Sequence, residues 1–215
     1  MICFVGSSFA PLHLRDAARK RGLELTEDLE KAKLVFVSED TPTKNGIRNL
    51  DLIEELIRNV YDKTNCPLVV TSQVPPGFTR SLRLDIYHMA ETLRVKDAEE
   101  RAYNPEQFIV GCEHPADPLP DPFLDYLTAF KCPIHQMTWE EAEFSKIAIN
   151  MTLASQVDNA NRLSEAAKKV GADWEVIRIV LEHDKRMGSY HKPGNWKESQ
   201  HLLRDYVTLL GIEHG

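Results

Sequence analysis

Apolar and polar positions follow two different periods along the first part of the chain. Short continuous apolar runs, typical of buried strands, alternate with segments that carry apolar residues every three or four positions, typical of amphipathic helices. Strand, helix and strand with short connections predict a parallel sheet covered by helices. The predicted strands are residues 2–5, 33–39 and 67–72, with further runs near 102–111 and 132–137, and the predicted helices are 10–22, 50–64 and 123–130. A helical turn is also predicted over 26–32, with Thr26 as its N-cap.

The pattern changes at Thr138, where more than thirty residues follow without glycine or proline. Thr138 and Glu141 form a capping box at the start of this segment, which predicts one long helix ended by Gly171. Two shorter helical patterns follow it. We therefore predict the α/β fold class, with a reduced Rossmann-like parallel sheet in residues 1–138 followed by an all-helical domain with a long central helix in residues 139–215.

Composition and charge exclude several classes of function. The chain has 26 basic and 33 acidic residues, a net charge of −7, and we do not expect it to bind nucleic acid, because that needs a basic face. Its apolar stretches are shorter than the ~18 residues of a membrane span, so we expect no membrane association and a cytoplasmic location. The four cysteines are widely spaced and the histidines show no i,i+4 pairing, so neither a disulfide framework nor a metal site is expected.

Five stretches, in this order, resemble the UDP-glucose/GDP-mannose dehydrogenase family. Each is weak alone, and their common order over roughly residues 23–188 carries the resemblance. They are TEDLEKAKLVFVSEDTPT (26–43), VVTSQVPPGFTR (69–80), NPEQFIVG (104–111), the long helical segment 141–173 and DKRMG (184–188).

The resemblance implies both a reaction and the residues that perform it. Enzymes of this family bind NAD on a Rossmann domain and oxidise the C6 alcohol of a nucleotide-sugar to a carboxylate, usually through a cysteine thiohemiacetal. The resemblance implies that Glu106 acts in proton transfer and in hydrolysis of the thioester, and that Arg186 lies near the sugar. It also implies that Lys146 and Asn150, one helical turn apart, bind the substrate and stabilise a developing oxyanion.

The resemblance also implies where NAD would bind, and here the chain departs from the family pattern. The implied cofactor-binding residues are Gly6, Ser7, Ser8, Thr41, Pro42, Ser72 and Gln73. Ser8 and Pro11 stand where the second and third glycines of a G-x-G-x-x-G loop belong. The strand that carries the ribose-binding acid is expected to be missing, and whether Glu24 replaces that acid stays open.

The nucleophile and the nucleotide-sugar-binding domain are also expected to be missing. Gly194 stands where the family has its cysteine, no thiol follows Cys132, and nothing in the sequence lowers the pKa of Cys112. The first interpretation is a divergent, truncated NAD-dependent nucleotide-sugar dehydrogenase with reduced or lost two-step oxidation, forming a homodimer through its helical domain. The alternatives are a non-catalytic binding or oligomerisation module, and a single-step 3-hydroxyacid-type dehydrogenase acting on a small molecule.

Overall fold

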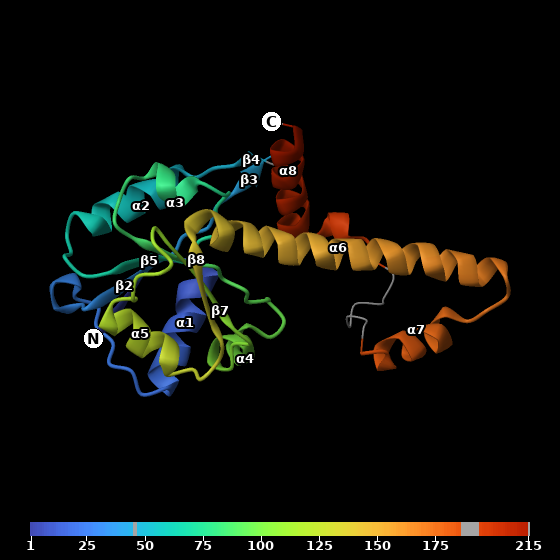
Figure 1. Cartoon of the computed structure of the whole chain (residues 1–215), viewed down its shortest axis with the longest axis horizontal. Helices are drawn as coiled ribbons and strands as arrows, with labels where there is room; N and C mark the ends of the chain where they lie inside the picture. Colours follow the sequence, from blue (N-terminus) through green and yellow to red (C-terminus); the bar gives the residue numbers. More distant parts are fainter. Residues whose placement is uncertain (45–46, 186–193, 215) are drawn as a thin grey trace. The chain divides into compact units, whose positions relative to one another are not determined.

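The computed structural model describes residues 1–44, 47–185 and 194–214. The chain forms two compact units (Figure 1). The α/β unit consists of Met1–Pro42 and Arg48–Lys146, and the helical unit of Thr43–Ile47 and Ile147–Gly215. The boundary between the two units therefore falls inside the long helix that the capping box begins, between Lys146 and Ile147.

The α/β unit is built on a mixed sheet in the order β1-β2-β5-β6-β7-β8. Its neighbouring strands run parallel except for β6 and β7, which are antiparallel. The α/β class with a mostly parallel sheet is confirmed, and the predicted all-parallel direction is wrong at this one pair. The strands are β1 (Ile2–Val5), β2 (Leu34–Val37), β5 (Leu68–Val70), β6 (Tyr87–Met89), β7 (Phe108–Cys112) and β8 (Ile134–Thr138).

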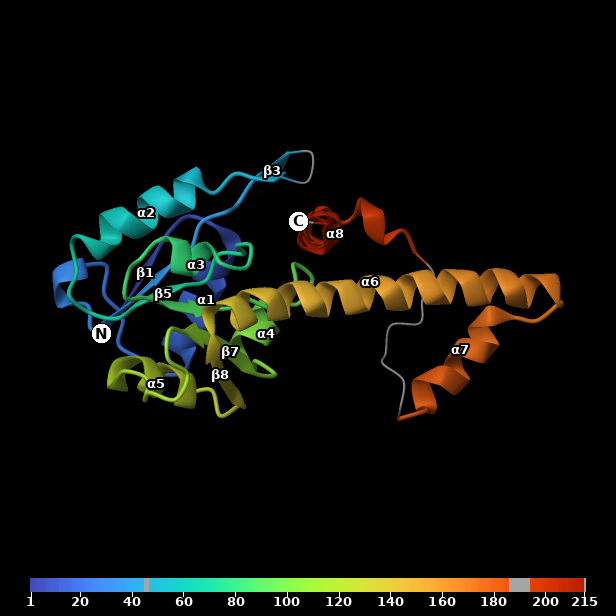
Figure 2. The same ribbon diagram turned by 45° about the horizontal axis from the view of Figure 1, so that its top comes forward.

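Helices cover both faces of this sheet because successive strand residues point to opposite faces (Figures 1 and 2). Ile2, Phe36 and Val69 pack with α1, α4 and α5 on one face, whereas Cys3 and Val35 pack with α2 and α3 on the other. The helices are α1 (Phe9–Lys20), α2 (Asp51–Tyr61), α3 (Phe78–Ser81), α4 (Ala98–Tyr103) and α5 (Asp121–Thr128).

A single β-bridge flanks β1 on the side away from β2. The Ile2 amide donates to the Glu24 carbonyl at 2.8 Å, and the Thr26 amide donates to the Ile2 carbonyl at 2.9 Å, which pairs Leu25 with Ile2. A doubly wound sheet has a complete strand at this position. The turn that follows is the 3-10 helix η1 (Leu29–Lys31), and its N-cap is Asp28 instead of the predicted Thr26.

The first turns of the long helix α6 (Trp139–Lys169) pack on the sheet of the α/β unit. The predicted capping box is confirmed, because Thr138 N donates to Glu141 Oε2 at 2.8 Å and Glu141 N approaches Thr138 Oγ1 at 3.4 Å. Gly111 of β7 allows the close approach of the helix, since a Cβ there would lie 2.8 Å from the Ala142 Cβ. Glu143 is 1% exposed and accepts from the Gly77 and Thr79 amides at 2.6 and 2.8 Å.

The helical unit has a small core of its own. Ala154 and Val157 of α6 pack with Trp196, and Met151 and Leu202 lie against them. The other elements of this unit are α7 (Trp174–His183), η2 (Trp196–Glu198) and α8 (Gln200–His214), and the short ribbon β3 (Thr43–Lys44) and β4 (Ile47–Arg48) precedes α2 in the chain. Within the described residues, no helix combines the length and apolar character that crossing a membrane requires.

Candidate functional site

Four parallel strands end at the same edge of the sheet. Residues that follow β1, β2, β5 and β6 there are Gly6, Glu39, Gln73 and Glu91. Because β7 runs antiparallel to β6, Glu106, which precedes β7, comes to this edge as well. Ligands of open α/β sheets bind outside the carboxyl ends of the strands, so this edge is the candidate site.

Gly6 turns the chain from β1 toward α1 in a conformation that favours glycine. Its φ is +121°, and a Cβ at this position would lie 1.7 Å from the Ser38 carbonyl oxygen. Any other residue would collide with the backbone at the end of β2. The single glycine that the loop keeps is therefore required by the close approach of two strands.

The hydrogen-bond donors of Ser7, directly after Gly6, contact the carboxylate of Glu39. The Ser7 amide donates to Glu39 Oε2 at 3.2 Å, and the Ser7 hydroxyl lies 3.3 and 3.2 Å from Glu39 Oε1 and Oε2. The buried Ser8 hydroxyl lies 3.2 Å from the Ser38 hydroxyl. Ser7 and Ser8, predicted to bind the cofactor, thus take their partners from the residues that follow β2.

These residues do not fit the pyrophosphate of NAD. A dinucleotide-binding loop presents free backbone amides to the phosphates, and its second glycine allows close approach. Here the Ser7 amide faces a carboxylate, and Ser8 and Pro11 replace the later glycines. The strand beside β1 that would carry a ribose-binding acid is reduced to the Leu25 bridge. We therefore assign no step of a reaction to NAD.

The other predicted cofactor residues tie the ends of β2 and β5 together. The Ser72 hydroxyl accepts from the Glu39 amide at 2.8 Å and donates to the Glu39 carbonyl at 2.7 Å. Thr41 Oγ1 donates to the Gln73 carbonyl at 3.0 Å. The Pro42 carbonyl accepts from the amide of Asn49, which lies just before α2, at 2.8 Å. Hydrogen bonds of this kind fix the edge on which the site is built.

Glu91, which the motif analysis missed, is the carboxyl group at the centre of a polar cluster. Burial raises its pKa, and the charge of Lys146, the Leu93 amide, the Gln73 side chain and the charge of Arg101 oppose that rise. Lys146 lies at the end of the α/β unit on α6. The signal in the sequence was a glutamate directly after the short run YHMA, which carries no recognisable period.

Glu106 lies at the surface beside this cluster. Its side chain is 75% exposed, and its Oε1 accepts from Arg101 Nη1 at 3.1 Å. Arg101 is more buried and also donates through Nε to the Thr92 carbonyl at 3.1 Å. Glu106 is thus linked to the Glu91 cluster through Arg101, and its predicted catalytic role stays a prediction.

Asn150 has its contacts in the helical unit. Its Nδ2 donates to Asp205 Oδ2 of α8 at 2.5 Å, and both residues are buried. Gly194, predicted to stand in place of the cysteine, donates its amide to Asn161 Oδ1 and accepts from Asn161 Nδ2, both at 2.8 Å. Arg186, predicted to lie near the sugar, falls outside the described residues.

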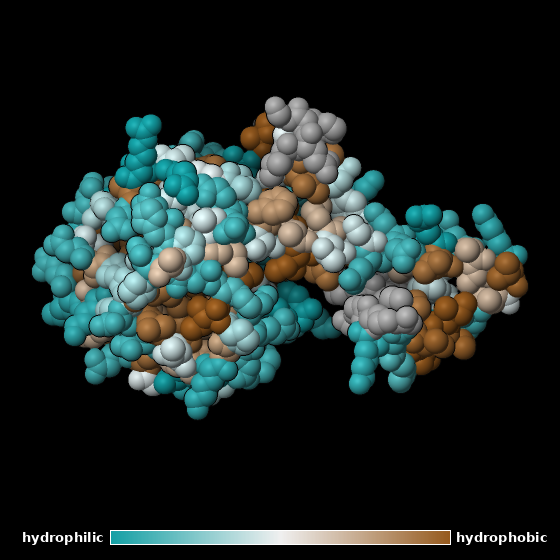
Figure 3. All heavy atoms as spheres, in the orientation of Figure 1, coloured by the Kyte–Doolittle hydropathy of each residue, from teal (hydrophilic) through white to brown (hydrophobic). Residues whose placement is uncertain are grey.

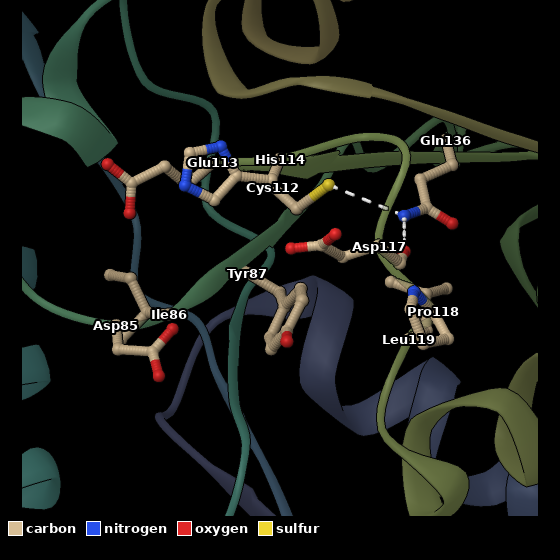
Figure 4. Close-up of a pocket in the computed structure, with 10 residues that line it drawn as sticks. All are labelled: Asp85, Ile86, Tyr87, Cys112, Glu113, His114, Asp117, Pro118, Leu119 and Gln136. Carbon is tan, nitrogen blue, oxygen red and sulfur yellow. Dashed lines mark hydrogen bonds between the residues drawn. The ribbon is translucent and has the colours of Figure 1, made fainter.

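Cys112 lies in a separate small cavity of about 100 Å³, shown in Figure 4. Burial raises the pKa of its thiol, which approaches the Met137 carbonyl at 3.5 Å and Gln136 Nε2 at 3.6 Å. A raised pKa leaves little thiolate at neutral pH, so the thiol is a weak nucleophile. Across the described ranges, no three His, Cys, Asp or Glu side chains are placed to hold a metal ion.

Residues 140–210 match the model of the UDP-glucose/GDP-mannose dehydrogenase family, central domain. The UDP-glucose 6-dehydrogenase YwqF of Bacillus subtilis is 28% identical over 178 residues, covering 75% of this chain and 40% of the relative. The UDP-glucose 6-dehydrogenase of Rattus norvegicus is 26% identical over 190 residues, covering 77% and 38%. The chain thus spans well under half the length of these relatives.

Solved structures of similar proteins share the fold. A UDP-D-ManNAc dehydrogenase from Pyrococcus horikoshii superimposes with a TM-score of 0.81 at 16% identity, over 100% of this chain and 65% of the other. A UDP-glucose dehydrogenase from Pyrobaculum islandicum gives 0.73 at 21% identity, over 99% and 68%. These likenesses show a shared fold, and the match over residues 140–210 identifies the helical part of the chain with the central domain of the UDP-glucose/GDP-mannose dehydrogenase family.

Proposed function

We propose that the chain is a divergent nucleotide-sugar dehydrogenase homologue that keeps a substrate-side polar cluster and performs the two-step oxidation weakly or not at all. The observation that supports this is the Glu91 carboxyl beside the charge of Lys146. A carboxyl group with a raised pKa next to an ammonium group suits proton exchange with a hydroxyl.

Each member of the cluster has a distinct role in this proposal. Lys146 donates to a sugar oxygen and favours negative charge on it, as a preorganised donor does. Glu91 accepts or returns the proton of that hydroxyl. The Gln73 side chain and the Leu93 amide hold the carboxylate in place. We place Glu91, instead of the exposed Glu106, nearest the reacting group.

The same proposal limits turnover. Oxidation of an alcohol needs a hydride acceptor, and the loop after β1 does not fit a dinucleotide. The described thiol of Cys112 has a raised pKa and lies in its own cavity. We therefore expect the chain to bind a nucleotide-sugar but to oxidise it slowly or not at all.

Saturation-transfer NMR with UDP-glucose and GDP-mannose tests the proposal. We expect saturable binding of one of them to the full chain, weakened at least tenfold by Lys146→Ala, because a charge-assisted hydrogen bond contributes about 1.5 to 3 kcal/mol. Lys169→Ala, an exposed lysine near the end of the same helix, should leave binding unchanged.

Two results would count against the proposal. Equal binding of the nucleotide-sugar by the wild type and by Lys146→Ala would show that the Glu91 cluster does not bind the substrate. Rapid NADH formation from NAD and either nucleotide-sugar, followed by absorbance, would show that the full oxidation is intact.

A second candidate function, oligomerisation through the helical unit, is favoured by an exposed apolar face on α7. Val176, Ile179 and Val180 lie three and four positions apart, on one face of the helix, and are 63%, 49% and 68% exposed. Figure 3 shows apolar side chains gathered on this part of the helical unit. We propose that a second copy of this chain covers this face.

A further inference from the structure

We propose that Glu39 occupies the anion position of the β1–α1 loop and thereby keeps nucleotide phosphates out of it. The Ser7 amide and hydroxyl both lie within 3.3 Å of the Glu39 carboxylate oxygens. Backbone amides at the start of a helix are the usual binding groups for phosphate and carboxylate alike. Glu39 and a phosphate therefore compete for the same donors.

Within the described part of the chain, α1 has no acidic residue in its own first turn. Its N-cap, Ser8, makes no side-chain capping hydrogen bond. The positive end of a helix dipole stabilises a nearby carboxylate. Glu39, reaching across from the end of β2, supplies the negative charge that this helix start lacks.

The backbone of Glu39 is fixed, so the carboxylate is held beside the loop. Both its amide and its carbonyl bond to the Ser72 hydroxyl, at 2.8 and 2.7 Å. The Asp40 amide also donates to Glu39 Oε1, at 3.1 Å. An entering phosphate must displace the carboxylate from the Ser7 donors and also meets a like charge, which repels it.

A titration with ADP tests this role. ADP carries the two phosphates but lacks the hexose whose hydroxyl Glu91 and Lys146 are proposed to bind, so its result is independent of the proposed function. We expect Glu39→Gln, followed by ¹H–¹⁵N NMR, to bind ADP at least tenfold more tightly than the wild type. Glu55→Gln on α2, an exposed carboxylate with the same change of charge, should leave ADP binding unchanged.

Equal ADP affinity in the wild type and Glu39→Gln, whether tight or undetectable, would overturn the proposal. The same spectra give a second measurement that does not depend on ADP. In the folded Glu39→Gln variant, the Ser7 amide shift should differ from that of the wild type, because the charge that this amide contacts has been removed. An unchanged Ser7 amide shift would also overturn the proposal.

Discussion

His88 is a titratable side chain buried at the centre of the sheet. It lies on β6, is 2% exposed, and pairs with Val70 and Gly111 of the neighbouring strands. Its Nδ1 has no hydrogen-bond partner among the described residues. Burial lowers its pKa from 6.5 to about 4, because the charged ring would lose its hydration.

The stability of the protein should therefore fall in acid. Unfolded His88 takes up a proton as the pH falls through 6.5, whereas the folded form resists it down to a pKa of about 4. The stabilisation is complete above 6.5 and decreases below it, by roughly 2 kcal/mol between pH 7 and pH 4.5. Urea unfolding at both pH values should show this loss for the wild type and a smaller loss for His88→Leu. Parallel pH dependence in the two proteins would contradict it.

Glu91 shows what a motif analysis misses at this scale. The Asn-Pro-Glu sequence drew attention to Glu106, yet the burial of Glu91 and its position near Lys146 depend on contacts between residues far apart in sequence. Periodicity gives no information on such contacts. The tight turn at Gly6, in contrast, could be predicted, because a glycine that ends an apolar run is typical of a tight strand-to-helix turn.

At the scale of elements, a carboxylate of α6 caps the short helix α3. Glu143 accepts from the Gly77 and Thr79 amides and is almost completely buried. Gly77, the N-cap of α3, has a φ of +89° and no capping side chain. The contact thus joins two elements that are far apart in the sequence.

Removing this carboxylate should destabilise the α/β unit. Glu143→Ala leaves the buried Thr79 amide without an acceptor, which costs about 1 to 3 kcal/mol, and the partly buried Gly77 amide adds a smaller cost. Glu140→Ala on the same helix removes an exposed pair with Arg80 and should cost less than about 1 kcal/mol. Thermal and urea unfolding of both variants gives the comparison. Equal losses in the two variants would argue that Glu143 has no special role.

Most elements could be predicted from the sequence, since their signals are local. The capping box of Thr138 and Glu141, the apolar run of β2 and the stripe of α2 each lie within one segment. Strand β6 could not be predicted, because three residues with His88 at their centre show no apolar pattern. Its antiparallel pairing with β7 depends on the path of the chain, which apolar periodicity does not encode.

At the scale of the whole molecule, the exposed apolar face of α7 leads to a prediction about assembly. We expect the wild type to elute as a dimer in size-exclusion chromatography with light scattering, because covering this face removes apolar area from water. Val180→Asp should shift the protein to monomer. Val95→Asp, at a valine of the α/β unit that is 81% exposed against 68% for Val180, should leave it dimeric. A monomeric wild type at high concentration would contradict this.

The single bridge at Leu25 has a consequence for the order of folding. The chain returns to β1 at Leu25 and again at Leu34, so β1, α1 and β2 form a unit of nearly local contacts. Local contacts form fast because closing short loops costs little entropy. We expect this unit to form in the transition state for folding. Leu25→Ala should then slow folding, whereas Leu127→Ala in α5 should mainly speed unfolding, and stopped-flow kinetics that reverse this pattern would refute it.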